Sequence, residues 1–454
     1  MTKRLFWLAG GVVLVATSAI VGAQSTGSRM IGINVVLNET LTPQLVQALE
    51  AYGRVRDELP QVNAVTMQVR ERDLATIQRL PWVEAANPDQ ERTGRPIDTV
   101  AATDFSDGLN TWDLDAVNVT DFGAGRQVAY DGNGVYVAVL DTGLLDSWRQ
   151  YFPQERIATQ YGIAFGGGGG ENGWVSSQPN KWEHDQNSHG THVTSTILGY
   201  SLGGTPIGGV APMATVIPVK VLNQNGSGWS SVIARGIVYV ADLKDGPLAG
   251  APVVINMSLG GSALDAVEKA AIDYAIGKGV IIVASAGNEG TRGMGYPGAY
   301  SPVISVAASG WVGEWTAAAW WRTLDVADPS DTDDFYIADF SSRQLVGQDL
   351  DVAAPGSWVL GPYQLQSGKT SYYYLGGTSM ASPHVAGIVA LMLQKNAALT
   401  ASQAETIMED TALALPPGCR NIRSPWGTTD QVCWGADATG AGLALADAAL
   451  AALP

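Results

Sequence analysis

The sequence predicts an α/β protein with a doubly wound, mostly parallel sheet, preceded by a small α+β domain. From Trp112 onward, short apolar runs alternate with longer segments of helical period, as in a parallel sheet with crossover helices. Buried strands are expected at Val135–Leu140, Val216–Leu222, Val253–Met257, Val280–Ala284 and Val303–Ala307. Crossover helices are expected at Val232–Leu243 and Ala266–Ile276. Right-handed connections would bring the carboxyl ends of the strands to one edge of the sheet.

The first 23 residues have the pattern of a secretory signal peptide. Two basic residues precede an apolar run from Leu5 to Val21, and small residues ending at Ala23 precede Gln24. An uncleaved membrane anchor is the alternative, because the run is almost long enough to cross a bilayer. The small and polar residues at the end of the run favour cleavage. We therefore expect a secreted protein, extracellular or periplasmic.

Residues 24–105 are expected to form a separate small domain and a linker, ahead of a large domain at 106–454. Strand and helix patterns alternate there as in a split βαβ sandwich. Strands are expected at Ile31–Leu37, near Val55, at Val62–Val69 and at Trp82–Ala85, and helices at Pro43–Tyr52 and Asp73–Leu80. The tail from Arg92 to Asn110 is polar and contains glycine and proline, as a cleavable linker would.

An acid, an imidazole and a hydroxyl follow one another along the large domain. Asp141 ends an expected buried strand, where open α/β sheets carry their reactive groups. His189 begins a helical pattern. Ser379 follows two glycines and precedes a long apolar segment, so a tight turn can hold its hydroxyl at a helix N-terminus. This placement suits an orienting carboxylate, a general base and a serine nucleophile.

The chain has four histidines, at 184, 189, 192 and 384. His384 lies five residues after Ser379 on one expected helix, about 140° further round the axis, and cannot turn back to it. His192 is only about 60° from His189, so geometry leaves both open as the general base. A metal site formed by His184, His189 and His192 is the alternative, but no HExxH motif accompanies it.

The motifs around these residues resemble those of the subtilisin-like serine proteases. They are Asp141-Thr142-Gly143, His189-Gly190-Thr191-His192, Ser285-Ala286-Gly287-Asn288 and Gly377-Thr378-Ser379-Met380. The resemblance implies that Asp141, His189 and Ser379 form a catalytic triad. It also implies that the side-chain amide of Asn288 and the backbone N–H of Ser379 donate to the oxyanion of the tetrahedral intermediate.

The resemblance further implies a role for the small domain and for two glycine-rich edges. The small domain is similar to the inhibitory propeptide of the family, which assists folding and then blocks the active site with its tail. An independent domain is the alternative. The edges expected to hold an extended peptide by strand addition are Gly226-Ser227-Gly228 and Ser258-Leu259-Gly260. Gly295 would lie at the floor of the pocket for the residue before the scissile bond, leaving room for large apolar or aromatic side chains.

The overall charge limits the partners that the protein can bind. A net charge of −17 and a pI near 4.6 argue against nucleic acid as a partner. A monomer acting on protein or peptide substrates is expected.

Cys419 and Cys433 lie in one stretch expected to be irregular, and outside the cytoplasm they should form a disulfide. Closing a loop of that length stabilises the fold by about 3 kcal/mol in the chain-entropy description.

No cofactor is expected for the chemistry, and structural calcium is left open. The segment from Trp311 to Ser342 is longer than the usual connection in the family and is rich in tryptophan and aspartate. Its aromatic residues are expected to form a small packed hairpin, and its acids lack the EF-hand spacing. The loop from Tyr200 to Gly208 lacks the asparagines that usually bind calcium in the family. The glycine run 166–170 is not followed by the Lys-Ser/Thr of a phosphate-binding loop.

The sequence therefore predicts a secreted serine endopeptidase made as a zymogen. A lipase or esterase uses the same chemistry, but its catalytic residues run in the order Ser, Asp, His on a GxSxG elbow. Here Ala381 replaces the final glycine of that elbow. A non-catalytic binding protein of the same fold is a further alternative. The presence of all four catalytic residue types argues against it.

Overall fold

The computed structural model describes residues 29–453 except 102–110, 122–124, 169–173, 318–319, 324–325, 327–329 and 365–370. The expected signal peptide at 1–23 and the expected boundary near residue 105 lie outside the described residues. Within the described part of the chain, no helix is long and apolar enough to span a bilayer.

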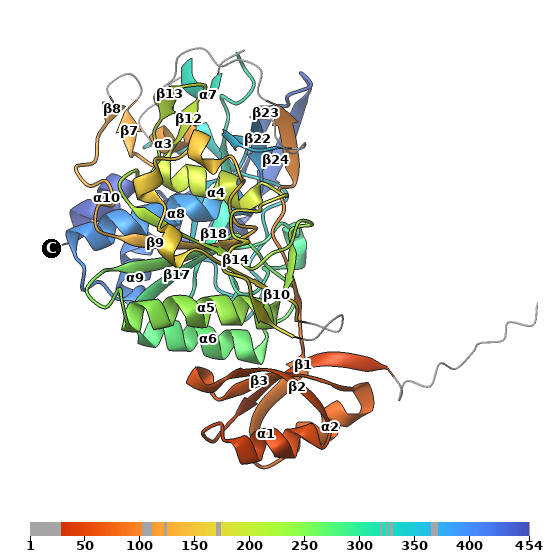
Figure 1. Cartoon of the computed structure of the whole chain (residues 1–454). Helices are drawn as coiled ribbons and strands as arrows, with labels where there is room; N and C mark the ends of the chain where they lie inside the picture. The colour runs from red at the N-terminus through yellow and green to blue at the C-terminus, as the bar shows by residue number, and fades with distance from the viewer. Residues whose placement is uncertain are drawn as a thin grey trace, which may run out of the picture.

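The N-terminal part forms a four-stranded antiparallel sheet in the order β2-β3-β1-β4, with two helices on its outer face (Figure 1). This is the predicted split βαβ arrangement. Its elements are β1 (Met30–Leu37), α1 (Pro43–Glu50), β2 (Gly53–Leu59), β3 (Ala64–Arg70), α2 (Leu74–Ile77) and β4 (Val83–Pro88). The strand expected near Val55 is seven residues long. Residues Ile33 to Leu37 of β1 are all buried because the sheet also packs, through its other face, against the large domain.

The large domain is built on a nine-stranded, mostly parallel sheet, as predicted. The order is β11-β10-β14-β9-β16-β17-β18-β19, and β20 also pairs with β18. The five strands predicted from the sequence are β9 (Tyr136–Asp141), β14 (Thr215–Lys220), β16 (Val253–Met257), β17 (Val280–Ser285) and β18 (Ile304–Trp311). Outside them lie β10 (Ile163–Gly166), β11 (Ser176–Ser177), β19 (Phe335–Ile337) and β20 (Val352–Pro355). Pairing is antiparallel only at β11 and β19.

Helices cover both faces of this sheet. One face packs against α4 (His189–Leu198) and α8 (Thr378–Lys395). The other packs against α5 (Ser230–Asp245) and α6 (Ala266–Gly277), which lie between the large sheet and the small domain (Figure 1). Shorter helices lie at α3 (Trp112–Ala116), α7 (Trp320–Thr323), α9 (Ala401–Thr411) and α10 (Ala446–Ala452). The predicted crossover helices are therefore confirmed.

The tail of the small domain, which the sequence predicts to be a cleavable linker, pairs with two strands of the large domain. It forms β5 (Glu91–Thr93), antiparallel to β15 (Ser227–Trp229), and β6 (Asp98–Ala101), antiparallel to β22 (Tyr372–Gly376). In turn, β22 pairs with β21 (Val359–Pro362). The sequence did not indicate these two strands, because both strand partners come from distant parts of the chain. The remainder of the expected linker, residues 102–110, lies outside the described residues.

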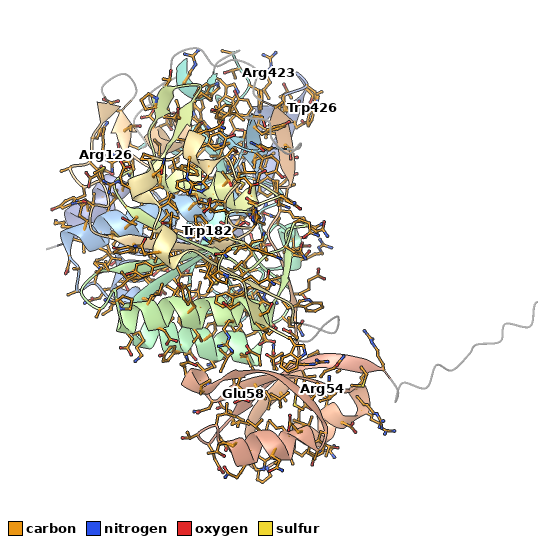
Figure 2. All side chains as sticks on the ribbon, viewed as in Figure 1. Arg54, Glu58, Arg126, Trp182, Arg423 and Trp426 are labelled. Carbon is orange, nitrogen blue, oxygen red and sulfur yellow. A yellow bond between two sulfur atoms is a disulfide. The ribbon has the colours of Figure 1, made fainter. Side chains whose placement is uncertain are left out.

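The stretch around the two cysteines is a hairpin, which corrects the expectation of irregular structure. Strands β23 (Gly418–Arg423) and β24 (Thr429–Trp434) pair antiparallel, with Cys419 directly opposite Cys433. The predicted disulfide joins them. Trp426, between the two strands, is 75% exposed and lies at the edge of the molecule (Figure 2).

The insertion after β18 turns its tryptophans inward. The ring centroid of Trp320 lies 6.1 Å from that of Trp112 and 5.4 Å from that of Trp315. Trp320 and Trp321 are completely buried. The predicted packed role of these aromatic residues is confirmed, and β19 pairs back onto β18 as one side of the expected hairpin.

Glu314, in the same insertion, is a buried acid without a cationic partner among the contacts that the structure describes. Its carboxylate accepts hydrogen bonds from the Tyr336 hydroxyl at 2.7 Å, the Ser357 hydroxyl at 3.1 Å and the Trp311 N–H at 3.1 Å. Burial raises the pKa of Glu314 to about 8, although these hydrogen bonds oppose the rise. The folded protein therefore holds this carboxyl group protonated at neutral pH.

We predict that the parent protein loses stability as the pH becomes alkaline and that Glu314→Gln prevents this loss. The folded-state pKa is raised, so the contribution of Glu314 is fully present below its unfolded pKa, about 4.3, and is lost as pH rises towards 8. Between pH 5 and pH 9, the free energy of unfolding of the parent should fall by about 4 kcal/mol relative to the variant. Calorimetry in a Ser379→Ala background, where self-digestion is not expected, would measure this difference.

The exposed Glu155→Gln substitution is the matched control, because Glu155 lies on the surface. Its stability relative to the parent should change little between the two pH values. The same small change in Glu314→Gln would contradict the prediction.

Candidate active site

The candidate site lies at the carboxyl ends of the central strands. Asp141 is the last residue of β9, Ser258 follows β16, and Asn288 lies three residues after β17. The N-termini of α4 and α8 bring His189 and Ser379 to the same edge. Open α/β sheets generally bind their ligands here, because the loops after parallel strands all emerge on this side.

Asp141 and His189 form a buried pair. The Nδ1 atom of His189 lies 2.8 and 2.9 Å from the two carboxylate oxygens of Asp141, and both side chains are fully buried. The Thr142 N–H donates to Asp141 at 2.6 Å and fixes the carboxylate. Because an ionised carboxylate can only accept, Nδ1 carries the proton of a neutral imidazole and Nε2 keeps its lone pair. Nε2 has no hydrogen-bond partner in the structure.

Ser379 is the second residue of α8, and its hydroxyl is not hydrogen-bonded to His189. The Ser379 Oγ donates to the carbonyl oxygen of Ser258 at 3.2 Å. The Ser258 hydroxyl donates in return to the carbonyl oxygen of Ser379 at 2.8 Å. The hydroxyl of Ser379 must therefore turn away from Ser258 to reach Nε2, and such bonds commonly tighten only when substrate is bound.

Asn288 is held in one orientation by the start of α8. Its side-chain oxygen accepts from the Thr378 N–H and from the Thr378 hydroxyl, both at 2.9 Å. The amide NH₂ is therefore the end that faces away from this helix turn and can donate. The N–H of Ser379 is among the first N–H groups of α8, which have no partner within the helix. Two donors thus lie beside Ser379, with the positive end of the helix dipole.

The other three histidines contact groups other than Asp141. His384 contacts Asp113 at 2.9 Å and the Met380 carbonyl at 2.8 Å. His192 lies 3.1 Å from the Val359 carbonyl, and burial together with the neighbouring His189 lowers the pKa of His192 to about 3. The contact with Asp141 distinguishes His189 from His192, in agreement with the family resemblance, whereas helix geometry alone left both open.

The remaining histidine, His184, contacts Asp146 at 3.0 Å on the surface. Across the described residues, which include all four histidines, no three of them gather as metal ligands.

The two predicted peptide-binding edges hold the tail of the small domain. Thr93 and Gly260 exchange two backbone hydrogen bonds of 2.9 Å, and the Gly94 N–H donates to the Gly226 carbonyl at 2.9 Å. Ser227 and Gly228 belong to β15 and pair with β5. Of the predicted residues, Leu259 is buried, with 1% exposure. The edges therefore already bind an extended chain by strand addition.

A cavity of about 560 Å³ opens beside Ser379. Gly295 lines it as predicted, together with Gly260, Asn288 and Thr378. The tail residue Arg95 also lines this cavity, and its guanidinium donates to the hydroxyl of Ser227, which is not one of the lining residues, at 3.0 Å. The cavity is thus available for a side chain.

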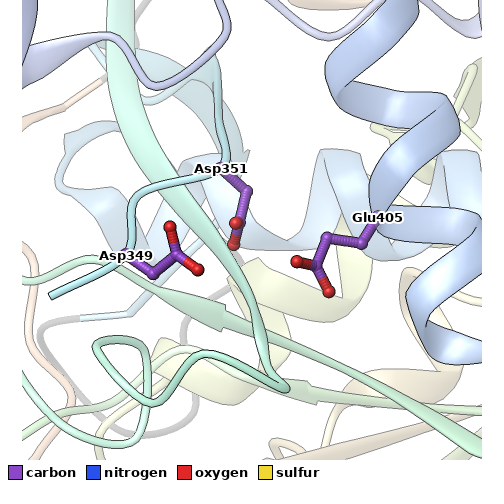
Figure 3. Close-up of side chains that lie close together, drawn as sticks. All are labelled: Asp349, Asp351 and Glu405. Carbon is purple, nitrogen blue, oxygen red and sulfur yellow. The ribbon is translucent and has the colours of Figure 1, made fainter.

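Three carboxylates that belong to none of the predicted motifs gather outside the set of residues that line the cavity. Asp349 and Asp351 precede β20, and Glu405 lies on α9 (Figure 3). One oxygen from each lies within 4.8 Å of the others. Two aspartates two residues apart before a strand share one side of an extended chain, which is a signal that the sequence does contain. The third ligand comes from a distant helix and had no local signal.

Asp351 is the buried member of this group. Its Oδ2 accepts from the Ser305 N–H at 2.6 Å and the Ser305 hydroxyl at 2.8 Å, whereas its Oδ1 has no hydrogen-bond partner. Burial raises the pKa of both Asp351 and Glu405 to about 7. A buried carboxylate oxygen without a donor fits the oxygen-rich shell that a hard cation such as calcium prefers.

Comparison with known proteins is consistent with this geometry. Residues 132–441 match the family described as the subtilase family. Thermitase from Thermoactinomyces vulgaris is 33% identical over 282 residues, which are 62% of this chain and 82% of thermitase. Subtilisin DY from Bacillus licheniformis is 35% identical over 290 residues, which are 63% of this chain and 86% of the relative.

Two solved structures share the fold. The first is fervidolysin from Fervidobacterium pennivorans, described as a keratinolytic enzyme related to subtilisin. It has a TM-score of 0.65 and 26% identity, over 94% of this chain and 62% of fervidolysin. This chain therefore spans less than two thirds of that protein. Sphericase has a TM-score of 0.52 and 29% identity, over 75% of this chain and 99% of sphericase.

Proposed function

This chain belongs to the subtilase family of serine proteases, and we propose that it is a secreted endopeptidase made as a zymogen. The observation that carries the proposal is the buried contact between His189 and Asp141, which leaves Nε2 without a partner among the described residues, at the sheet edge where the first turn of α8 holds Ser379. A neutral imidazole held in this tautomer is ready to accept a proton from a hydroxyl.

In the proposed mechanism, Ser379 Oγ attacks the carbonyl carbon of the scissile peptide while His189 Nε2 takes its proton. Asp141 stabilises the resulting imidazolium. The amide of Asn288 and the N–H of Ser379 donate to the oxyanion of the tetrahedral intermediate. His189 then returns the proton to the leaving amine. Water, activated by the same imidazole, hydrolyses the acyl-enzyme and restores Ser379.

The small domain is proposed to be the inhibitory propeptide. Its tail fills the peptide-binding edges, and the rest of the domain contacts α5 and α6 through a network of polar side chains. Asn34 donates to Asp89 at 2.9 Å and to Asp265 at 2.8 Å. Asp89 in turn accepts from the Ser231 N–H at the start of α5. Such an interface would hold the tail in the cleft until the chain is cut.

Two further features extend the proposal. The N-terminal run ending at Val21 and the single disulfide favour export. The cavity of about 560 Å³ at Gly295 favours a large apolar or aromatic residue before the scissile bond, since a glycine at its floor leaves room and adds no charge. No cofactor is needed for the proposed chemistry. We propose that Asp349, Asp351 and Glu405 would hold a structural calcium ion, whose role is to stabilise the fold.

We predict that a fluorophosphonate labels Ser379 and that Ser379→Ala abolishes both the label and self-cleavage of the chain. Mass spectrometry of the labelled peptide, and of the intact chain over time, would measure the two effects. Ser382→Ala is the matched control, because Ser382 is a buried serine one turn further along α8 that donates to Asn256. Label at another residue, or undiminished in Ser379→Ala, would contradict the mechanism.

We predict that Asn288→Leu lowers kcat by about 100- to 1,000-fold, because one donor to the oxyanion is lost. KM should change much less, since the ground-state carbonyl gains little from this donor. Steady-state kinetics on a peptide amide would measure both constants. An equal change in kcat and KM would argue for a structural role, through the contact of Asn288 with Thr378.

We predict that calcium raises the melting temperature of the Ser379→Ala protein and that Asp349→Asn combined with Glu405→Gln removes this effect. Calorimetry with calcium and with chelator would test it. Asp339→Asn serves as the control, because Asp339 is an acid outside this group. A calcium effect that survives in the double variant would place the ion elsewhere.

A further inference from the structure

Arg92 of the tail extends from β5 into the large domain and meets a buried acid. Its two neighbours in the strand, Glu91 and Thr93, are exposed, whereas Arg92 is buried. Its Nε lies 3.1 and 3.2 Å from the two carboxylate oxygens of Glu268, and its Nη2 lies 2.5 Å from Oε2. Both side chains have no exposed area. Two parallel contacts between a guanidinium and one carboxylate make a strong and geometrically selective ion pair.

The pocket around this guanidinium belongs to the large domain. Nη2 also donates to the Ala263 carbonyl at 2.9 Å. A Cβ atom on Gly261 would lie only 2.6 Å from Nη1, so the glycine provides the space that the guanidinium fills. Asp265 adds a second acid whose charge favours the cationic form of Arg92. All of these groups stay with the large domain when the tail leaves.

The position of the tail relative to Ser379 defines which substrate residue this pocket would receive. A Cβ atom on Gly94 would lie 3.3 Å from His189 Cε1, so Gly94 sits against the imidazole. A Cβ atom on Gly377 would lie 3.7 Å from Pro96 Cα and 3.7 Å from the amide nitrogen of Asn288. The bond between Arg95 and Pro96 thus lies between the general base and the oxyanion donor.

The chain continues past this bond in the same extended direction. The Ile97 N–H donates to the Gly376 carbonyl at 2.7 Å, two residues before the start of α8. The tail therefore crosses the cleft as a substrate would, with Arg95 as the residue before the scissile bond. Counting back from Arg95, Arg92 is the fourth residue before that bond.

Stabilisation of α6 alone does not explain why Glu268 is buried. Glu268 lies in the first turn of α6, where the helix dipole favours an acid, but that benefit does not require burial. Burial raises the pKa of Glu268, and the neighbouring Arg92 opposes this rise. A carboxylate placed in such a pocket is costly unless a cation accompanies it. The pocket is therefore built for a cationic partner.

We propose that the mature enzyme selects arginine at the fourth residue before the scissile bond, with Glu268 as the specificity-determining residue. This inference rests on the proposed proteolytic function and names a substrate class for it. Lysine should be a weaker substrate residue, because its ammonium is a point charge that cannot match both carboxylate oxygens. The propeptide occupies the same pocket with the residue that the enzyme prefers.

The test uses the self-processed enzyme and three quenched fluorescent peptides that differ in one residue. Their sequences are Arg-Thr-Gly-Phe-Ala-Ile, Lys-Thr-Gly-Phe-Ala-Ile and Leu-Thr-Gly-Phe-Ala-Ile, cleaved after phenylalanine. Alanine replaces the proline of the tail, because proline restricts the chain on both sides of the bond. Labelling with the fluorophosphonate gives the concentration of active sites for each preparation. We expect kcat/KM for the arginine peptide to exceed that for the leucine peptide by about 30-fold or more, since one unpaired partner of a buried charge pair is costly.

The variant Glu268→Leu should lose or reverse this ratio. Because Arg92 would then lack its partner during folding, the double variant Arg92→Leu with Glu268→Leu provides a second preparation with a matched apolar pair. Asp273→Asn is the control, since Asp273 lies further along α6 in contact with Lys269 on the surface. Its ratio should stay at the parent value.

The possible results distinguish a failure of the arginine inference from a failure of the proposed proteolytic function. An arginine-to-leucine ratio near one in the parent, or a high ratio that persists in both Glu268 variants, would overturn the arginine selection while leaving the protease assignment intact. Failure of the labelled parent to cleave any of the three peptides, together with failure on denatured casein, would overturn the proposed function and the inference with it.

Discussion

The parallel direction of β9, β16 and β17 is the constraint on which the cleft depends. Because these strands are neighbours and run the same way, the residues that follow them emerge at one edge. Asp141, Ser258 and Asn288 come together there although long segments of chain separate them. The two helices that begin at this edge complete the site, since α4 starts with His189 and α8 presents Ser379 in its first turn. No single loop carries the chemistry.

The contact between the two domains depends on α5 and α6, the helices on the opposite face of the large sheet. The starts of α5 and α6 face the small domain, and acids from both domains accept hydrogen bonds from their first turns. Asp89 accepts from Ser231 on α5, while Asp265 accepts from the N–H groups of Val267 and Glu268 on α6. A salt bridge between Arg235 and Asp57 adds to this contact further along α5. These polar, geometrically selective contacts accompany an apolar patch in which Val36, Leu59 and Ala64 pack against the large domain.

Elements with a strong local pattern could be predicted, and contacts between distant segments could not. The buried strand expected at Val253–Met257 has the bounds of β16, and the helical pattern expected from His189 begins where α4 begins, because apolar runs and helical periods are local signals. The polar strand β5 has no such signal, and only its partner β15 makes it a strand. At the site, helix periodicity alone could not separate His189 from His192, and only the family resemblance favoured His189. Nothing in the sequence indicated that Glu268 receives a guanidinium, because Arg92 lies 176 residues away.

The way the tail crosses the cleft has a consequence for maturation. Strand β5 is bonded to one wall and β6 to the other, so the site of the first cut decides which product keeps β6. In the proposed maturation, a cut between Arg95 and Pro96 would make Pro96 the new amino terminus of the enzyme, with Ile97 and β6 still paired with β22 and covering the leaving-group side. A cut beyond Ala101 would instead let β6 depart with the small domain. The two products would share every catalytic group, yet they would differ in how much room a protein chain finds downstream of the bond being broken.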